Sequence, residues 1–409
     1  MKATISYGEK SLTVEAESFH IAPPNQVEER DGITVLSHSI DNPVDSEPFS
    51  HFIEDEFLIV VNDAQRPTLT PAVLEVLLER VTHNEFSIAV ATGSHAPPNE
   101  KELTYIFGNY YPRFKEKIHI HKALDTPHDY YGTTSQGIEV YFDRIIKNFR
   151  KIIVIGSVEP HYFAGFTGGR KGFLPGLASY KTIEQNHKFA LEKEAKNLAL
   201  HGNPVHEGME EAVKLIQKDI FAVNMVLDQN RRVFACSSGN IFSSFYEATD
   251  HSKRAYCVPT PRRDIVLAVA PYPLDVTLYQ AQKAIENGKL ALNDQGILIL
   301  VAQCRNGIGP DTFYTLLKQS KTPVEALNSL KKGYKLGYHK AGKIAELTIR
   351  AQIWAVTDLE PSILEDVFMK PYTSVQSALN DAIREKGGEV LVLPEASMTV
   401  PMCELACLH

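Results

Sequence analysis

Short apolar runs rich in β-branched residues recur along this chain, and they constrain its fold more than any other feature. Four of them occupy residues 56–63 (EFLIVVND), 85–93 (EFSIAVATG), 151–159 (KIIVIGSVE) and 264–271 (DIVLAVAP). Helical patterns such as TPAVLEVLLERV at 70–81 lie between some of these runs. The alternation predicts an α/β fold with mainly parallel sheets flanked by helices. Because the carboxyl ends of parallel strands usually open onto a binding crevice, the polar residues after each run are the first candidates for a site.

The length of the chain, 409 residues, favours two domains over one. Residues 245–263 are polar, weakly periodic and punctuated by prolines, which is typical of a linker or a surface crossover. We therefore predict a larger N-terminal α/β domain over residues 1–260 and a smaller C-terminal α/β domain over 264–395. The tail, about 396–409, is a candidate to return to the first domain. We expect the active site in the cleft between the domains.

Local patterns add detail to this outline. Apolar and polar residues alternate on both sides of Gly8, which predicts a hairpin at the N-terminus. The second domain has strand patterns at 295–304 and 388–397 and a helical pattern at 374–387. The predicted C-terminal domain is therefore a β/α series of its own.

The amino-acid composition of the chain limits the kinds of partner that it could bind. The chain has 42 Lys and Arg residues against 50 Asp and Glu residues, which argues against a protein whose main task is to grip nucleic acid. It has neither a run of about 18 apolar residues nor the long apolar core of a signal peptide. The five cysteines lack CxxC spacing and fit reduced thiols in a cytoplasm: Cys236, Cys257, Cys304, Cys403 and Cys407. A small polar substrate remains the open possibility.

The first polar groups after the predicted strands are Asp63, Arg66 and His95. An arginine in such a loop can bind a carboxylate or a phosphate with its planar fork. Histidine is the natural proton carrier near neutral pH. The alternatives are an Asp–Arg ion pair on the surface and a solvated loop histidine.

A glycine-lined lysine follows the 151–159 run in the segment PHYFAGFTGGRKG. His161 opens the segment, and Gly168 and Gly169 allow close approach of the backbone before Lys171. The spacing excludes a Walker A loop, since a glycine stands where Ser or Thr should follow the lysine. Lys171 could contact a phosphate or form a covalent bond. His187, on a predicted helix sixteen positions later, is either a packing residue or a metal ligand.

Three other histidines, His119, His121 and His128, stand close together in the segment HIHKALDTPHD. They raise the alternative of a zinc hydrolase. However, the chain has no HExxH motif and no Cys/His spacing of a structural zinc site. We therefore rank this alternative below the others.

Taken together, the motifs NDAQRP, GSH, EPHYFAGFTGGRK, NH and LYQAQK resemble the nickel-dependent lactate racemase family, which comprises 2-hydroxyacid racemases and epimerases. The resemblance covers nearly the whole chain and is strongest over residues 151–187. It implies a nickel-pincer nucleotide, a pyridinium-3,5-bisthiocarboxylic acid mononucleotide of nickel, covalently attached at Lys171. It also implies that His187 is the protein ligand of the nickel and that Gly168 and Gly169 make room for the nucleotide.

The same resemblance assigns the catalytic acid and base. His95 and His161 would be the paired acid–base residues on the two faces of the substrate carbon. Asp63 would lie at the cofactor site and orient a catalytic histidine, and Arg66 would approach the substrate. The chain departs from the family motif at Gln65, where threonine is more usual, and this puts the fine specificity in doubt more than the class.

In the second domain the resemblance implies substrate-binding roles for Tyr279, Gln280, Lys283 and Trp354. The expected function is racemisation or epimerisation of a 2-hydroxyacid, lactate or a related acid, by reversible hydride transfer. The expected partners are the small-molecule substrate and the proteins that make the cofactor, with no nucleic acid and no membrane. The alternative function is a nucleotide- or phosphate-binding protein without racemase activity, in which Lys171 acts only as a charge.

Overall fold

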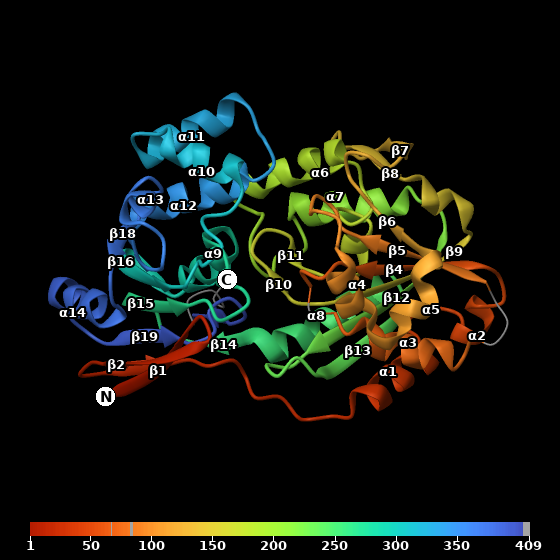
Figure 1. Ribbon diagram of the computed structural model, residues 1–409, viewed down its shortest axis with the longest axis horizontal. Helices are drawn as coiled ribbons and strands as arrows, with labels where there is room; N and C mark the ends of the chain where they lie inside the picture. Colours follow the sequence, from red (N-terminus) through yellow and green to blue (C-terminus); the bar gives the residue numbers. More distant parts are fainter. Residues whose placement is uncertain (67, 82–84, 404–409) are drawn as a thin grey trace. The chain divides into compact units, whose positions relative to one another are not determined.

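The computed structural model describes residues 1–66, 68–81 and 85–403, which form two compact units. One unit runs from Gln26 to Ala255, and we call it the continuous unit. The other combines Met1–Asn25 with the chain from Tyr256 onward, and we call it the split unit. Each unit has a six-stranded sheet with helices packed on it (Figure 1). The predicted α/β class is confirmed.

The sheet of the continuous unit has the strand order β13-β12-β9-β4-β5-β6. All neighbours are parallel except β12 and β13, which are antiparallel. The strands are β4 (Phe57–Asn62), β5 (Phe86–Ala91), β6 (Ile118–Ile120), β9 (Lys151–Ser157), β12 (Asp219–Leu227) and β13 (Val233–Asn240). Strands were predicted at three of these places. Because β4, β5 and β9 are parallel neighbours, the residues that follow them lie at one edge of the sheet.

Alternate residues of the central strands pack on opposite faces of this sheet. Phe57, Ile59 and Val61 belong to a large core cluster with α1 and α3, whereas Val60 and Val154 point to the other face. The helices of the unit are α1 (Gly32–Asp41), α2 (Phe49–Phe52), α3 (Thr70–Leu78), α4 (Glu100–Phe107), α5 (Tyr111–Phe114), α6 (Tyr180–His187), α7 (Pro204–Lys214) and α8 (Ser243–Tyr256). A hairpin of β7 (His128–Thr133) and β8 (Glu139–Asp143) and a shorter one of β10 (Pro160–His161) and β11 (Gly165–Phe166) complete it.

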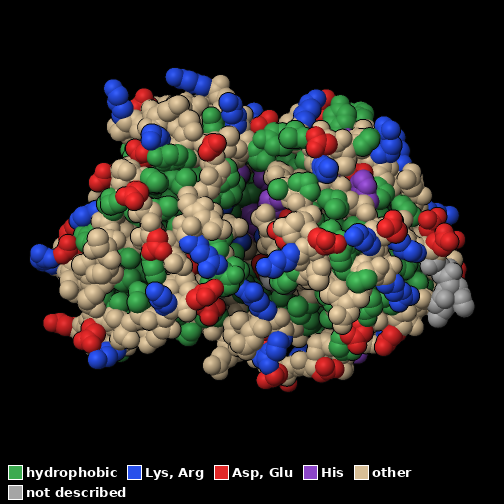
Figure 2. Space-filling view, viewed as in Figure 1, with side chains coloured by type: hydrophobic (Ala, Val, Ile, Leu, Met, Phe, Trp, Pro, Cys, Tyr) green, Lys and Arg blue, Asp and Glu red, His purple; other side chains and the backbone are tan. Residues whose placement is uncertain are grey.

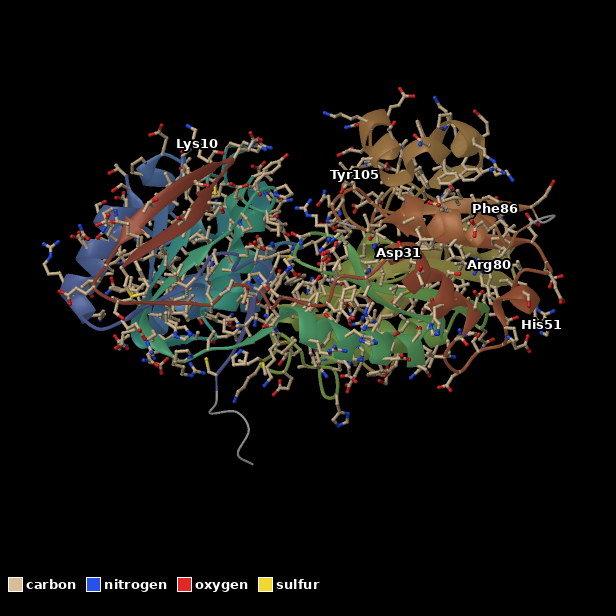
Figure 3. All side chains as sticks on the ribbon, turned by 90° about the horizontal axis from the view of Figure 1, so that it is seen from below. Lys10, Asp31, His51, Arg80, Phe86 and Tyr105 are labelled. Carbon is tan, nitrogen blue, oxygen red and sulfur yellow. The ribbon has the colours of Figure 1, made fainter. Side chains whose placement is uncertain are left out.

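Polar contacts fix both ends of α1, and Figure 3 labels one residue of each contact, Asp31 and Arg80. At its start, the Asp31 carboxylate accepts the N–H of Thr34 at 3.0 Å, as an N-cap does. At its end, Arg80 from the segment after α3 donates to Asp41 at 2.7 Å. These contacts hold α1 against α3 on one face of the sheet and leave the other face for different elements.

The sheet of the split unit is entirely parallel, with the order β18-β17-β16-β15-β19-β3. Its strands are β3 (Phe19–Ile21), β15 (Arg263–Val269), β16 (Leu292–Val301), β17 (Gln352–Val356), β18 (Lys370–Tyr372) and β19 (Val390–Leu393). Its helices are α9 (Leu278–Gly288), α10 (Asp311–Lys318), α11 (Pro323–Lys332), α12 (Tyr338–Arg350), α13 (Pro361–Glu365) and α14 (Val375–Lys386). The predicted hairpin around Gly8 is present as β1 (Lys2–Tyr7) and β2 (Lys10–Glu15).

The observed division corrects the predicted boundaries. Residues 1–25 were assigned to the first domain, but they pack in the split unit. The reason is long-range pairing, since β3 adds to the edge of β19 and the hairpin places Ala3 and Ile5 in the core cluster of that unit. The tail also stays there as far as Cys403, because β20 (Val400–Met402) pairs with β14 (Cys257–Pro259). Residues 404–409, with Cys407, lie outside the described residues.

The predicted linker at 245–263 is also wrong over most of its length, because helix α8 covers Ser243–Tyr256. Although the stretch is polar overall, Phe245, Ala248, Ala255 and Tyr256 are buried and give the helix an apolar face. Over the described chain, no helix is both long and apolar enough to cross a membrane. On the face seen in Figure 2, acidic and basic side chains are interspersed.

Candidate active site

Asp63 and His95, which follow β4 and β5, meet at the carboxyl edge of the sheet. The Nδ1 atom of His95 lies 2.6 Å from Oδ2 of the buried Asp63 carboxylate. Since a carboxylate can only accept, Nδ1 donates and the lone pair of the neutral ring remains on Nε2. The other carboxylate oxygen of Asp63 accepts the N–H of Gln65 at 3.2 Å. Asp63 therefore sets both the orientation and the tautomer of His95.

Arg66 belongs to the same turn as Asp63. Its backbone N–H donates to the carbonyl of Asp63 at 3.2 Å, and its side chain is half-buried. The predicted pair of charged residues is thus held in one local structure, and the proline that follows lies outside the described residues.

His161 occupies the short hairpin of β10 and β11, where it pairs with Gly165. Gly165 has a φ of +74°, and a Cβ there would lie 2.2 Å from the carbonyl oxygen of Ala199, so only glycine fits. The Nδ1 atom of His161 accepts the N–H of Ala164 at 3.3 Å. The neutral ring consequently carries its proton on Nε2, which is the opposite tautomer from that of His95.

The Phe163 ring lies among three of the predicted site residues. It makes edge contacts with the rings of His161 and His187, at centroid distances of 4.5 and 5.2 Å. The ammonium of Lys171 lies 5.7 Å from the centre of the same ring. Histidine, lysine and histidine, separated in the sequence, therefore surround one aromatic side chain.

His187 ends helix α6 and is buried. Burial, together with the nearby groups Lys171 and His95, lowers the pKa of His187 to about 3. The imidazole is therefore neutral at physiological pH, which is the form that binds metals. Lys171 and His95 are thus both close enough to His187 to affect its pKa.

The glycine loop before Lys171 packs tightly on the sheet. Gly168 has a φ of +94°, and a Cβ there would lie 2.4 Å from a methyl carbon of Val158. The N–H of Gly169 donates to the side-chain oxygen of Asn224 at 2.9 Å. A Cβ on Gly172 would meet Val154 at 2.6 Å. Close packing on the face of Val60 and Val154 explains why the loop is rich in glycine.

In the split unit, helix α9 groups three of the predicted substrate-binding residues. Tyr279, Gln280 and Lys283 occupy its amino-terminal half, and all three are half-buried. The Tyr279 ring makes an edge contact with Phe313 at 5.5 Å, and the ammonium of Lys340 lies 3.7 Å from its centre. Helix α9 thus places Tyr279, Gln280 and Lys283 within about one helical turn of each other.

Trp354 does not have the position expected of a residue in a pocket wall. It lies on β17, is 1% exposed and belongs to the core cluster of the split unit. Its ring stacks on Tyr372 at 5.0 Å and its indole N–H donates to Gln352 at 2.9 Å. We correct the prediction: this tryptophan is a core residue, because a strand buried on both faces uses large apolar side chains for packing.

The three clustered histidines have a structural explanation. His119 and His121 both contact Oδ2 of the buried Asp143 at 2.8 Å, and the ring of His128 packs against His121 at 5.4 Å. Burial acts to raise the pKa of Asp143, but the hydrogen bonds from the two histidines outweigh it and lower the pKa well below its usual range. Among the described residues, no group of three or more His, Cys, Asp or Glu side chains could hold a metal ion. Within the described residues, the contacts with Asp143 and the ring packing account for the positions of these three histidines.

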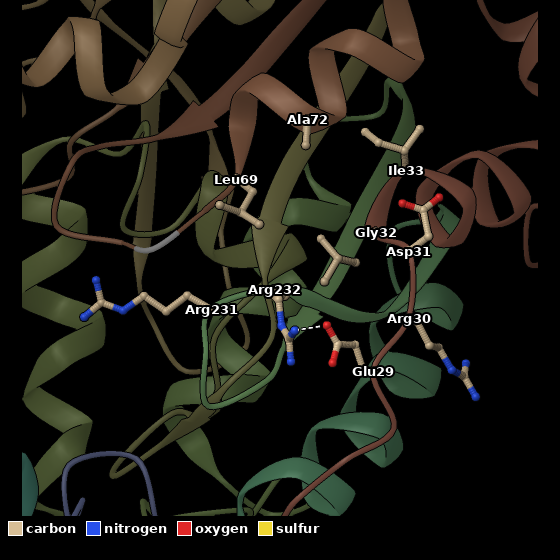
Figure 4. A pocket seen from close by; sticks show the side chains of 10 residues that line it. Glu29, Arg30, Asp31, Gly32, Ile33, Leu69, Ala72, Arg231 and Arg232 are labelled. Carbon is tan, nitrogen blue, oxygen red and sulfur yellow. Dashed lines mark hydrogen bonds and ion pairs between the residues drawn. The ribbon is translucent and has the colours of Figure 1, made fainter.

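A depression of 510 Å³ on the continuous unit is separate from these residues (Figure 4). The ten residues that line it include Arg30, Arg231 and Arg232 but none of the predicted site residues. Two of its arginines are already paired, Arg30 with Glu28 at 2.9 Å and Arg232 with Asp228 at 2.9 Å. We therefore do not assign the active site to this depression.

Comparison with known proteins identifies the family. The lactate racemase N-terminal domain matches residues 6–199, and the lactate racemase C-terminal domain matches residues 258–400. Together these matches cover most of the chain. The chain belongs to the lactate racemase family. It is therefore an enzyme of the racemase class.

Individual lactate racemases are similar over most of their length. The lactate racemase of Thermoanaerobacterium thermosaccharolyticum is 27% identical over 88% of this chain and 88% of its own. That of Lactiplantibacillus plantarum is 28% identical over 94% and 92%. The structure of the lactate racemase apoprotein from T. thermosaccharolyticum covers 98% of this chain and all of its own, with a TM-score of 0.92 and 25% identity. A Thermotoga maritima protein with a TM-score of 0.68 and 16% identity shares the fold.

In this lactate racemase family member, the structure also shows groups near Lys171 that our sequence reasoning missed. Phe163 and Arg170 lie inside the quoted motif, yet we assigned them no role. Arg170 is 1% exposed, and its partner His206 was not considered at all. An arginine between a glycine pair and a lysine was the available signal, but its burial could not be read from a local pattern.

The residues present fit a nickel-pincer nucleotide. His187 offers one neutral, buried imidazole, and the described chain lacks a group of three or more protein ligands that could hold a metal alone. An imidazole of this kind suits Ni(II), and a pincer nucleotide would supply the other ligands. The ammonium of Lys171 and the ring of His187 lie against the same Phe163 side chain.

Proposed function

We propose that this enzyme interconverts the two configurations of a 2-hydroxyacid, lactate or a related acid, with a nickel-pincer nucleotide joined to Lys171. The observation that carries the proposal is the convergence of His95, Lys171 and the neutral imidazole of His187, with His161 packed on the same phenylalanine. Family membership supports the reaction type, and the names of the two similar enzymes support lactate as the first substrate to test.

The proposed cofactor site consists of Lys171 as the point of covalent attachment, His187 as the nickel ligand, and Gly168 and Gly169 in the loop beside them. Asp63 lies at the same edge of the sheet. When bound, the nucleotide supplies a reversible acceptor for hydride from the substrate carbon. Attachment would remove the positive charge of Lys171, which would leave a less repulsive environment for a cation at His187.

The paired acid and base of the proposal are His95 and His161. His95 has its lone pair on Nε2 because Asp63 accepts from Nδ1, so it is ready to take the proton of the substrate hydroxyl. His161 has its proton on Nε2 because Nδ1 accepts from Ala164, so the neutral ring can donate a hydrogen bond from Nε2, and it acts as an acid only after it takes up a second proton. For the opposite enantiomer the two residues exchange roles: the histidine that enters neutral takes the hydroxyl proton, and the one that enters protonated returns a proton to the substrate oxygen.

For the substrate carboxylate we propose Arg66 from the continuous unit, and Tyr279, Gln280 and Lys283 from the split unit. A guanidinium fork suits a carboxylate, and lysine and amide groups add charge and directional donors. That these four residues contribute to one site, placed in a cleft between domains, stays a prediction.

The proposal also includes the setting of the enzyme. The cysteines of the sequence lack CxxC spacing and fit reduced thiols, which supports the expected cytoplasmic compartment. The proposed partners are the proteins that make the nucleotide, because the protein cannot act without its cofactor.

The decisive experiment is chiral chromatography of single-enantiomer 2-hydroxyacids after incubation with enzyme that was co-produced with the cofactor pathway and verified to contain nickel. We expect conversion to the opposite configuration, and loss of conversion with retained nickel in His95→Ala and His161→Ala. No conversion over a broad panel at full nickel loading, or wild-type rates in either variant, would reject the proposed reaction.

The metal ligand is tested separately with His187→Ala. Because this imidazole is the one protein ligand that we assign, we expect nickel content to fall at least about tenfold while the circular dichroism spectrum stays unchanged. His128→Ala is the matched control, since it removes a half-buried histidine from the other cluster. Full nickel occupancy in His187→Ala would contradict the assignment.

A further inference from the structure

Arg170, which precedes Lys171 in the sequence, is a buried cation that donates hydrogen bonds to backbone carbonyl groups of the glycine loop. Its Nη2 donates to the carbonyls of Ala164 and Phe166 at 3.0 and 3.1 Å. Its Nη1 faces the carbonyls of Thr167 and Gly168 at 3.5 and 3.4 Å. One planar guanidinium therefore organises the loop from 164 to 168 from inside.

The remaining donor of Arg170 determines the tautomer of a second histidine. Nε donates to Nδ1 of His206 at 2.9 Å. Since arginine cannot accept, Nδ1 of His206 must carry the lone pair and Nε2 the proton. Nε2 faces Oε1 of Glu210 at 3.3 Å and the hydroxyl of Tyr246 at 3.2 Å. Tyr246 in turn donates to the same carboxylate oxygen at 3.0 Å.

Glu210 is the counter-charge of this network. His206 and Glu210 stand one turn apart on α7, so both project from one side of the helix. Burial acts to raise the pKa of Glu210, but the hydrogen bonds from His206 and Tyr246 and the charge of Arg170 outweigh it and lower the pKa. Burial also lowers the pKa of His206, which keeps this ring neutral. The neutral imidazole of His206 thus links the carboxylate of Glu210 to the buried guanidinium of Arg170.

An aromatic ring covers one flat face of the Arg170 guanidinium. Arg170 lies 4.1 Å from the centre of the Phe245 ring, a stacked arrangement that suits a weakly hydrated planar cation. Burial lowers the pKa of Arg170 to about 9, so the group keeps its charge at neutral pH. With its fork, its Nε and its ring face all engaged, Arg170 has one well-defined position.

This position bears on Lys171 because the two residues are consecutive in the short 3-10 turn Gly169–Gly172. Arg170 points toward α7 and α8, whereas Lys171 lies near Phe163 and His187. We propose that Arg170, held by His206 and Glu210, is a positioning residue that presents Lys171 for attachment of the nucleotide. The proposal rests on the proposed function for the identity of the group that Lys171 receives.

The first test uses the wild-type apoprotein and depends on no cofactor. In protein labelled with ¹⁵N-histidine, we expect His206 to be neutral at pH 7 with its proton on Nε2. A ring that is protonated on Nδ1, or on both nitrogens, would overturn the proposal because Arg170 would then have no acceptor there.

The second test compares His206→Phe, which removes the acceptor, with His206→Gln, whose side chain can accept from Arg170 and donate to Glu210. In the apoproteins, we expect amide hydrogen exchange of residues 164–172 to rise about tenfold or more in His206→Phe and to return toward wild type in His206→Gln. His251→Phe on α8 is the control, since this half-buried histidine lies beside Phe234 instead. Equal exchange in all variants would overturn the proposal.

The third test measures the mass of Lys171 peptides from protein co-produced with the cofactor pathway. We expect the modified fraction to fall about tenfold in His206→Phe and to recover in His206→Gln, as for other residues that orient a cofactor ligand. Full modification in His206→Phe would contradict the positioning role. Absence of modification in the wild type would instead contradict the proposed function, while the tautomer and exchange results would still decide on Arg170. If His206→Phe does not fold, the tautomer in the wild type decides.

Discussion

His95 and His161 carry their protons on different ring nitrogens because each Nδ1 has a different neighbour. The Asp63 carboxylate makes Nδ1 of His95 a donor, whereas the N–H of Ala164 makes Nδ1 of His161 an acceptor. In the neutral rings, Nε2 therefore carries the lone pair in His95 and the proton in His161. His206 shows the same principle away from the proposed reaction, since Arg170 determines which of its nitrogens is protonated.

The role of Asp63 leads to a prediction at this scale. In Asp63→Asn the amide can donate to Nδ1 of His95, which would move the proton to Nε2 and remove the base. We expect kcat to fall roughly 10- to 100-fold with little change in KM or in nickel content. Steady-state kinetics of the nickel-loaded enzyme measure this, with Asp125→Asn in an exposed turn as the control. An unchanged kcat would show that Asp63 does not orient the base.

At the scale of elements, the site depends on short, tightly packed pieces rather than on long helices. The hairpin of β10 and β11 holds His161, the turn Gly169–Gly172 holds Lys171, and the eight-residue helix α6 ends at His187. These pieces stay in place because they pack on the sheet, and glycine is required where the backbone approaches it most closely.

This packing predicts different costs for two glycine substitutions. Gly168 has φ +94° and ψ +169°, a region that is essentially reserved for glycine, and a Cβ there would also clash with Val158. Gly137 has φ +80°, but a Cβ added there would meet no atom within 4 Å. We expect Gly168→Ala to lower the free energy of unfolding by about 1–3 kcal/mol more than Gly137→Ala. Chemical denaturation of the apoproteins measures both free energies of unfolding. Equal losses in the two variants would contradict the prediction, because they would show that the loop can rearrange around the added Cβ.

At the scale of the whole molecule, a buried carboxylate joins segments that are distant in the sequence. Asp143 at the end of β8 contacts His119 on β6 and His121 just after it, and His121 also contacts the carbonyl of Ala178 at 3.0 Å. Ala178 lies between the loop of Lys171 and the helix of His187. The stability of this junction therefore supports the candidate site.

The lowered pKa of Asp143 predicts how stability depends on pH. A carboxylate whose pKa is depressed by folding stabilises the protein fully above its ordinary pKa of about 4, and this contribution is lost as the pH falls toward the lowered value. We expect wild type to exceed Asp143→Asn in free energy of unfolding at pH 5, and the difference to shrink by pH 3. Urea unfolding followed by circular dichroism measures it. A difference that stays constant down to pH 3 would contradict this role.

The division into units shows where local patterns lose their predictive power. The strands at 57–62, 86–91, 151–157 and 263–269 were predictable because a run of apolar β-branched residues is a local property. By contrast, β3 is three residues long, and only its partner β19, far along the chain, makes it a strand. The stretch of α8 was predicted to be a linker for a related reason. Its apolar face can be recognised only from the residues that pack against it.

The sequence by itself determined the α/β class, the order of the motifs and the chemical groups available to the candidate site, because these depend on residue type and spacing. Only the tertiary structure decided that Asp63 faces His95, that Lys171 and His187 are neighbours, that Arg170 is buried and that Trp354 belongs to the core. The physical reason is that tautomers, shifted pKa values and burial arise from contacts between residues that are far apart in the sequence, which a local pattern does not specify.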